Sequence, residues 1–148
     1  MKTLIICESH HQQNTIKVAR RLATVLNAGV VPAMAAESIE EYDLIGFGSG
    51  IYFQRHHRAL LTLAEKLNLK DKPVFVFSTS GLGWRRYNRH LIKILKSKGA
   101  TVVGDFTCKG RDTFGLLKLI GGIARRHPNE KDLKKAEAFA LGLLKSEL

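Results

Sequence analysis

The sequence is poor in cysteine, in acidic residues and in long apolar runs, and each shortage excludes a class of protein. Two cysteines, Cys7 and Cys108, are too few for a disulfide framework, which favours a reducing compartment, the cytoplasm. The charge-free stretch 73–84 contains Ser, Thr and Gly and is too short to cross a membrane. Glu8 interrupts the N-terminal apolar run before a signal-peptide region develops. We therefore expect one globular domain over residues 1–148.

Acidic residues are outnumbered, with 13 Asp and Glu against 24 Lys and Arg, a net charge of +11. Such a balance permits an acidic protein partner, an anionic substrate, a phosphorylated ligand or peripheral contact with an anionic membrane. Charge alone does not choose among these. No recognisable nucleic-acid-binding module is present, so we do not expect nucleic acid as a partner.

Short apolar runs alternate with segments of helical period, which is typical of an α/β protein with a parallel sheet. Strands are expected at 2–7, 30–31, 43–50, 73–79 and 101–108, and helices at 15–27, near 60–67, at 86–98 and from 129 onward. Right-handed crossovers then give a three-layer sandwich around a five-stranded parallel sheet of order 2-1-3-4-5. In this order, ligands bind at the carboxyl ends of the strands, where the loops 8–14, 50–57 and 80–87 should converge.

The first of these loops, C-E-S-H-H-Q-Q-N-T, lacks the glycine that usually lets a backbone wrap a phosphate. It offers Ser9, Asn14 and Thr15 as side-chain donors at the start of a helix, where backbone N–H groups and the helix dipole attract an anion. The loop is thus competent for a phosphate. The alternative is that Asn14 and Thr15 only cap the helix.

The second and third loops combine glycines with aromatic residues. Two such loops can clamp a flat ring, and the glycines let backbone groups reach its polar edges. The alternative is that Tyr52 and Trp84 only cover the end of the sheet. The candidate binding residues are Ser49, Gly50, Ile51, Tyr52 and Phe53 in the second loop, and Thr79, Ser80, Gly81, Leu82, Gly83 and Trp84 in the third.

Two histidine pairs, His10-His11 and His56-His57, lie on loops that the strand order makes neighbours. Adjacent residues of an extended chain point in opposite directions and chelate poorly, so we expect no metal. We expect His10 or His11 beside a phosphate instead. No serine, cysteine or carboxylate arrangement has the context of a catalytic site, so no catalytic residue is predicted.

Three motifs at these positions carry a resemblance to a known family: S-H-H-Q-Q-N-T, G-S-G-I-Y-F and S-T-S-G-L-G. Over nearly the whole chain the sequence resembles flavodoxins. The resemblance implies an electron-transfer protein that binds FMN non-covalently, with the ring between the second and third loops. It implies ring stacking on Tyr52 or Trp84, and backbone contacts from Gly50 and Gly81. The phosphate would lie in the first loop, among Ser9, His10, His11, Gln12, Gln13, Asn14 and Thr15.

The chain departs from the flavodoxin pattern in two respects. Gln12 and Gln13 stand where a glycine is expected, and the chain is basic where flavodoxins are typically acidic. A redox partner of this protein should therefore be acidic. The stretch G-S-G-I-Y-F-Q-R-H-H-R-A also resembles menaquinone-dependent protoporphyrinogen oxidase. This implies a flavin enzyme acting on a quinone or protoporphyrinogen as an alternative; a binding module without flavin is the third.

Overall fold

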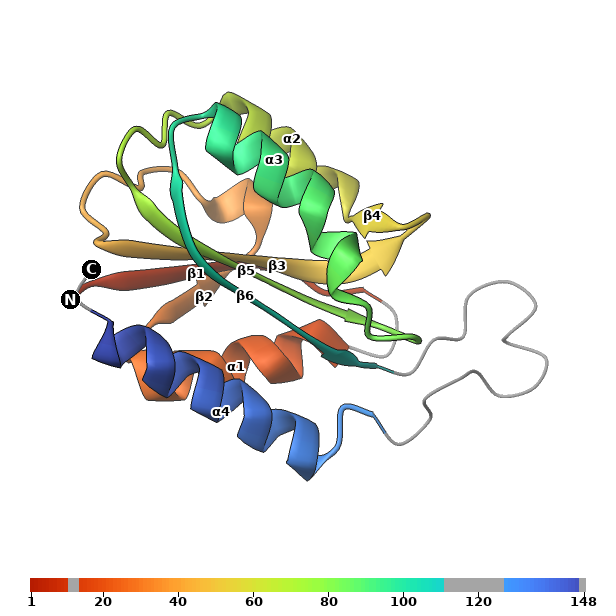
Figure 1. The fold of residues 1–148 in the computed structure, drawn as a ribbon. Coiled ribbons are helices and arrows are strands. Elements are labelled where there is room, and N and C mark those ends of the chain that lie inside the picture. The colour runs from red at the N-terminus through yellow and green to blue at the C-terminus, as the bar shows by residue number, and fades with distance from the viewer. Residues whose placement is uncertain (11–13, 111–126, 147–148) are drawn as a thin grey trace.

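A computed structural model describes residues 1–10, 14–110 and 127–146, which form a sheet between two layers of helices (Figure 1). The parallel strands, in sheet order, are β2 (Gly29–Val31), β1 (Thr3–Glu8), β3 (Leu44–Tyr52), β5 (Pro73–Ser80) and β6 (Thr101–Lys109). One face is covered by α1 (Asn14–Leu26) and α4 (Glu130–Lys145), the other by α2 (Arg58–Lys66) and α3 (Arg89–Ser97). Counting only these strands, the predicted order 2-1-3-4-5 is confirmed.

The second loop differs from its prediction, because most of it is a β-hairpin. Strand β3 continues to Tyr52, and a short antiparallel strand, β4 (Arg55–His56), pairs with it. The turn between them is Phe53–Gln54, with φ of 51° and 68°. A two-residue turn with two positive φ values normally carries Asn-Gly or a similar pair. Because neither residue here is Asn or Gly, the sequence contains no hairpin signal.

Two short 3₁₀ helices complete the fold, η1 (Ala33–Ala35) and η2 (Arg85–Asn88). The second occupies the first turn of the helix that we expected from residue 86, so α3 itself begins at Arg89. In the described residues, no helix is both long and apolar enough to cross a membrane.

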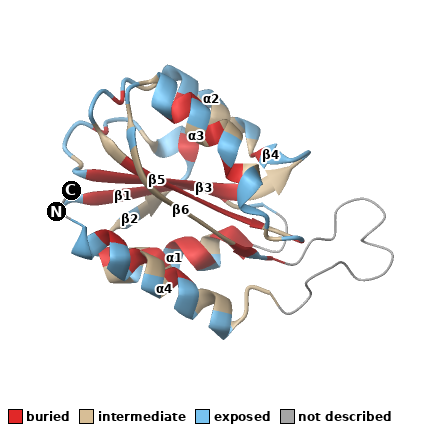
Figure 2. Cartoon of the chain, in the orientation of Figure 1, coloured by how far each residue is buried: buried red, intermediate tan, exposed pale blue. Residues whose placement is uncertain are grey.

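The core explains why β3 reads L-I-G-F-G-S-G. The central strands are buried on both faces, and the edge strands are half-buried (Figure 2). On the side of α1 and α4, the rings of Phe75 and Phe77 from β5 lie over Gly46 and Gly48 of the neighbouring β3. A Cβ at Gly46 would lie 2.3 Å from the Phe75 ring, and one at Gly48 would lie 2.2 Å from the Phe77 ring. These glycines leave the space that the two phenylalanines fill.

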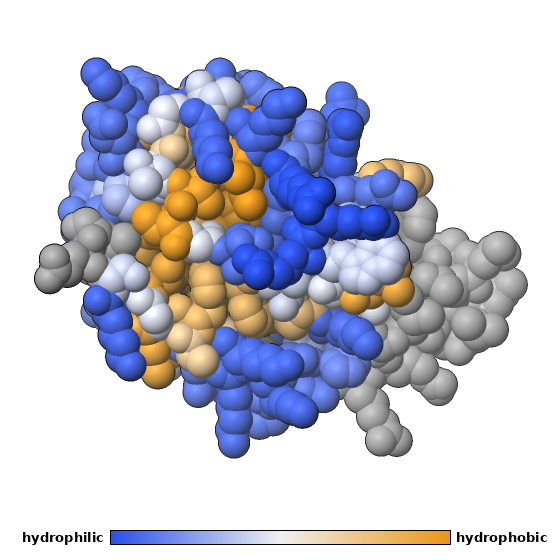
Figure 3. All heavy atoms as spheres, viewed as in Figure 1, coloured by the Kyte–Doolittle hydropathy of each residue, from blue (hydrophilic) through white to orange (hydrophobic). Residues whose placement is uncertain are grey.

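The outer edge of the sheet is β6, whose residues between Val102 and Thr107 are half-buried. Figure 3 shows an apolar band on this side of the molecule, with strongly hydrophilic side chains lying across it. Arg85 spans the edge and donates from Nη2 and Nε to the two carboxylate oxygens of Asp105, at 2.6 and 3.2 Å. A charged pair on an edge strand discourages pairing with another chain.

We predict that Gly48→Ala destabilises the fold by about 1–3 kcal/mol, because the new methyl group collides with the buried Phe77 ring. The control is Gly142→Ala on α4, where an added Cβ has no neighbour within 4 Å. In this exposed helical position alanine should stabilise by roughly 1 kcal/mol. Urea unfolding of both variants measures the two effects, and equal effects would contradict this account of the core.

Candidate functional site

The parallel strands bring their carboxyl ends into one row. Glu8 at the end of β1 pairs in register with Ser49 of β3, and Ser49 pairs with Ser78 of β5. The segments after these strands therefore emerge at the same end of the sheet, away from the two chain termini (Figure 1). This is the convergence that the strand order predicts, and the contacts described below join each segment to the other two.

The first segment ends in a helix start suited to an anion. The Ser9 hydroxyl accepts a hydrogen bond from the Ile16 N–H at 3.0 Å and so caps α1. The first turn of α1, which lies wholly in the described residues, contains no acidic side chain. The positive end of the helix dipole is therefore left for another anion. The predicted residues His11, Gln12 and Gln13 lie outside the described residues.

Asn14 and Thr15 make contacts that stabilise the segment itself. The buried hydroxyls of Thr15 and Thr79 lie 2.8 Å apart and join the first segment to the third. Asn14 packs against Gly110, where an added Cβ would lie 2.9 Å from the Asn14 side chain. The Gly110 N–H in turn donates to the Ser80 carbonyl at 2.9 Å. Both side chains thus have local structural roles.

A cluster of Glu8, His10 and His57 joins the first segment to the second. One Glu8 carboxylate oxygen accepts from the Ala33 N–H at 2.7 Å, and the other lies 2.9 Å from His10 Nε2. The His10 and His57 rings stack with centroids 4.4 Å apart, and the Tyr52 ring meets His57 edge-on. Burial and the neighbouring His10 lower the pKa of His57, which favours its neutral form at neutral pH.

The cluster also tests the possibility of a metal, since ligand atoms of Glu8, His10 and His57 lie within 4.8 Å of one another. Nδ1 of His57 accepts a hydrogen bond from the Ala59 N–H at 3.0 Å, capping α2, so the proton of neutral His57 resides on Nε2. The His10 Nε2 atom is likewise engaged, 2.9 Å from a Glu8 carboxylate oxygen. The geometry therefore favours the cap and the stack over a metal ion.

A buried hydrogen-bonded chain joins the second segment to the third, and sequence reasoning missed it. His56 Nδ1 lies 2.9 Å from the Ser49 hydroxyl, and His56 Nε2 lies 2.8 Å from Asn88 Oδ1. The Asn88 amide donates to the Phe106 carbonyl, and the Ser49 hydroxyl accepts from the His57 N–H at 2.8 Å. Burial lowers the pKa of His56 to about 4. Ser49 is fully buried and its hydroxyl is engaged within this chain, so its predicted role in ligand binding stays a prediction.

The hairpin carries the remaining predicted residues of the second segment. Ile51 pairs with His56, and Tyr52 with Arg55. The half-buried Tyr52 ring lies over Gly50, where an added Cβ would be 3.5 Å from the ring. The tip residue Phe53 is 85% exposed. Tyr52 and Gly50 thus lie together at the mouth of the site.

The third segment turns sharply and then exposes its aromatic residue. The Gly83 N–H donates to the Ser80 hydroxyl at 2.8 Å, and Gly83 adopts a φ of 63°, which glycine accommodates without strain. Gly81 is buried, whereas Leu82 and Trp84 are exposed. The Arg86 guanidinium lies 4.0 Å from the centre of the Trp84 ring, and Tyr87 stacks on Trp84 at 5.7 Å.

The two cysteines are not reactive groups of this site. Cys7 and Cys108 are free and buried, and burial raises the pKa of each thiol to about 12. Reactive cysteines have a lowered pKa and access to solvent. Both are inert core residues.

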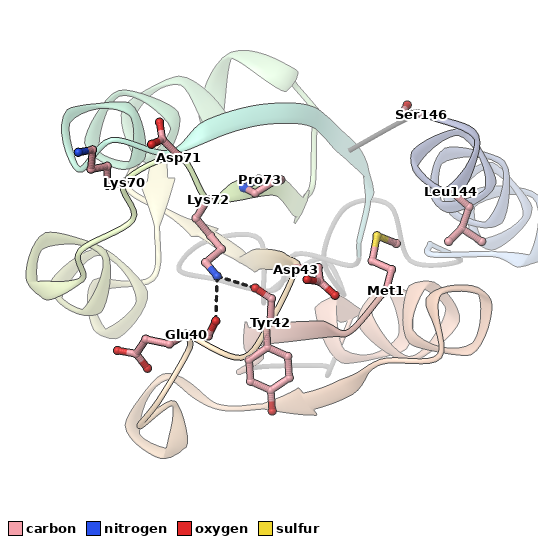
Figure 4. A pocket seen from close by; sticks show the side chains of 10 residues that line it. All are labelled: Met1, Glu40, Tyr42, Asp43, Lys70, Asp71, Lys72, Pro73, Leu144 and Ser146. Atoms are coloured by element: carbon pink, nitrogen blue, oxygen red, sulfur yellow. Dashed lines mark hydrogen bonds between the residues drawn. The ribbon is translucent and has the colours of Figure 1, made fainter.

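A separate hollow lies at the opposite end of the sheet, lined among others by Met1, Asp43, Lys72 and Leu144 (Figure 4). Lys72 Nζ donates to the backbone carbonyls of Tyr42 and Glu40 at 2.6 and 3.3 Å. These hydrogen bonds stabilise the segment that leads into β3. The described lining includes none of the predicted ligand residues. This hollow is not the candidate site.

Comparison with known proteins settles the family. A flavodoxin-domain family model matches residues 4–111. The chain belongs to the flavodoxin family. A curated relative, an uncharacterized protein from Methanocaldococcus jannaschii, is 44% identical over 150 residues, which covers 99% of this chain and all of the relative.

Solved structures agree on the fold at much lower identity. Oxidised flavodoxin 2 from Bacillus cereus superposes with a TM-score of 0.70 at 19% identity, covering 98% of this chain and 99% of its own. A flavodoxin variant from Fusobacterium nucleatum, solved with bound flavin mononucleotide, gives 0.67 at 16% identity, with 95% and 94% covered. The fold is that of a family of flavin-binding electron-transfer proteins.

The neutral His56 predicts a pH-dependent stability. Its folded pKa of about 4 lies below the unfolded value of 6.5, so the unfolded chain binds the proton more tightly. Stability from this group is complete above pH 6.5 and is lost as the pH falls toward about 4. The loss should be about 3 kcal/mol. Urea unfolding across this range should show that His56→Gln has a shallower pH dependence than the unchanged protein. Identical slopes would contradict a neutral buried His56.

Proposed function

We propose that this protein binds FMN non-covalently and transfers electrons between partner proteins. The observation that carries the proposal is the convergence of three segments at one end of the sheet, each joined to the other two. One segment offers a helix start without acidic residues, and the other two offer aromatic rings beside glycines. This is the chemistry that a ligand with a phosphate at one end and a flat ring at the other requires.

The residues present fit this cofactor. The phosphate would lie at the start of α1, near the Ser9 hydroxyl and the His10 ring. The one described carboxylate beside it, Glu8, has its two oxygens occupied by contacts with the Ala33 N–H and with His10. The ring would lie between Tyr52 and Trp84, with backbone groups of Gly50 and Gly81 at its edges. Bound FMN supplies the redox chemistry, while the chain binds, orients and electrostatically tunes it.

The charge of the chain bears on its partner. With a net charge of +11, this protein would attract an acidic redox partner or an anionic substrate and repel basic proteins. We place it in the cytoplasm, where a reducing environment suits two free, buried thiols.

A flavin-dependent oxidoreductase acting on a quinone or protoporphyrinogen is the second candidate. The exposed arginines around the site favour it, because they provide an attractive entrance for an anionic substrate. Turnover of such a substrate by the FMN-loaded protein would distinguish the enzyme from the carrier. The hydrogen-bonded side chains of Ser49, His56 and Asn88 are buried and are too enclosed to act on either substrate.

The single tryptophan of the chain makes FMN binding directly measurable. Titration of the flavin-free protein with FMN should quench the fluorescence of Trp84, because the ring would lie against or beside the flavin. Riboflavin, which lacks the phosphate, should bind at least roughly tenfold more weakly. Absence of binding and quenching with FMN would overturn the proposal.

A charge change at the helix start tests where the phosphate lies. Lys17→Glu places a carboxylate in the first turn of α1, and it should weaken FMN roughly tenfold while changing riboflavin affinity little. Lys70→Glu makes the same change at the opposite end of the sheet and serves as the control. Equal losses for FMN and riboflavin in Lys17→Glu would place the phosphate elsewhere.

A further inference from the structure

The β3–β4 hairpin carries an aromatic ring at a position that its turn does not favour. Phe53 is 85% exposed at the tip, and both turn residues adopt positive φ, 51° for Phe53 and 68° for Gln54. Asn and Gly adopt this conformation readily, whereas a bulky side chain does so at a cost. Exposure also means that the ring contributes little to the core. Phe53 thus serves neither the turn nor the core well, which points to a role at the surface.

More exposed apolar side chains lie on the neighbouring third segment. Leu82 is 46% exposed and Trp84 is 42% exposed. The hydrogen bond between His56 and Asn88 holds β4 beside η2, so hairpin and third segment project at the same end of the molecule (Figure 1). Figure 3 shows apolar groups beside strongly hydrophilic ones at this end. The apolar residues are therefore at tips, separated by charged side chains.

Those charged side chains are arginines. Arg55, Arg58, Arg86 and Arg89 are exposed, and the Arg86 guanidinium lies 4.0 Å over the Trp84 ring. The segments 44–64 and 72–104, which include the hairpin and η2, contain no Asp or Glu, and the carboxylate of Glu8 at this end is hydrogen-bonded to Ala33 and His10. At the opposite end acidic and basic residues are mixed: Glu40, Asp43 and Asp71 line the hollow together with Lys70 and Lys72.

We propose that this end of the molecule, the hairpin face (Phe53, Arg55, Leu82, Trp84 and Arg86), docks on an anionic phospholipid bilayer. Aromatic and aliphatic tips enter the boundary between headgroups and acyl chains, while guanidinium groups pair with lipid phosphates. Apolar tips that lie among cationic side chains suit insertion between anionic headgroups, and an acidic protein as the partner is the alternative outcome of the test. The inference deepens the proposed function and rests on it, because docking in this orientation turns the mouth of the flavin site toward the membrane.

Vesicle binding tests the proposal on the full chain as purified. The protein should sediment with phosphatidylcholine vesicles that contain phosphatidylglycerol, less so as salt rises, and not with phosphatidylcholine alone. Phe53→Asn should weaken this binding roughly tenfold through the loss of one inserted ring. The same variant should unfold at a higher temperature, since Asn suits the positive φ, so weaker binding would not reflect misfolding.

Two matched controls locate the effect. Leu144→Asn removes an exposed apolar residue from the opposite end of the sheet and should leave vesicle binding unchanged. The pair Arg55→Gln and Arg86→Gln should weaken binding more than the pair Lys66→Gln and Lys70→Gln, which has the same net charge. Equal effects within either comparison would overturn the hairpin face as the docking surface.

A soluble polyanion separates the membrane from an acidic protein as the partner. Polyglutamate would compete with the vesicles for the basic protein. If it displaces the protein from the vesicles completely, and if Phe53→Asn binds vesicles as well as the unchanged protein does, the surface is one for acidic proteins and the proposal fails. The FMN titration is independent of vesicles. Vesicle binding without FMN binding would overturn the proposed function alone, and FMN binding without vesicle binding would overturn only the docking.

Discussion

The parallel register of β1, β3 and β5 is the constraint on which the candidate site depends. It places Glu8, Ser49 and Ser78 in one row, so the chain must leave all three strands at the same end. Three kinds of contact then join the segments in pairs. These are the Thr15–Thr79 hydroxyl bond, the His10–His57 stack and the His56–Asn88 hydrogen bond. The strands thus bring the segments together, and these side-chain contacts hold them in place.

These contacts differ in burial, and we infer different roles for the buried and the exposed ones. The hydrogen-bonded side chains of Ser49, His56 and Asn88 are buried, His56 is neutral, and the His56–Asn88 bond holds the hairpin against η2. The His10 ring, by contrast, is exposed and can adjust to an anion at the start of α1. A site held in this way loses little freedom on binding, which leaves more of the interaction energy for affinity.

The sequence was sufficient for the sheet order and for the end of the sheet at which the three segments converge, because apolar period and crossover handedness determine both. It was insufficient for the hairpin, because Phe53 and Gln54 form a turn with positive φ that these residue types do not predict. It also missed the partnership of His56 with Asn88, which lie 32 residues apart and meet only once β4 and η2 pack. Thr15 and Ser49 were recognised as residues of this end of the sheet, but whether a hydroxyl faces a ligand or a neighbour depends on packing.

Family membership and charge answer separate questions about this protein. The fold rests on residues such as Gly46, Gly48, Phe75 and Phe77, which are buried inside the molecule. The charges on the surface can vary without changing that core. In this chain, the segments 44–64 and 72–104 contain no acidic residue. Those segments include β3, the hairpin, η2 and α3, which are the elements framing the mouth of the site. In the proposed function, electrons would cross at the exposed edge of the bound flavin, so charge placed there would select the partner without disturbing the buried core.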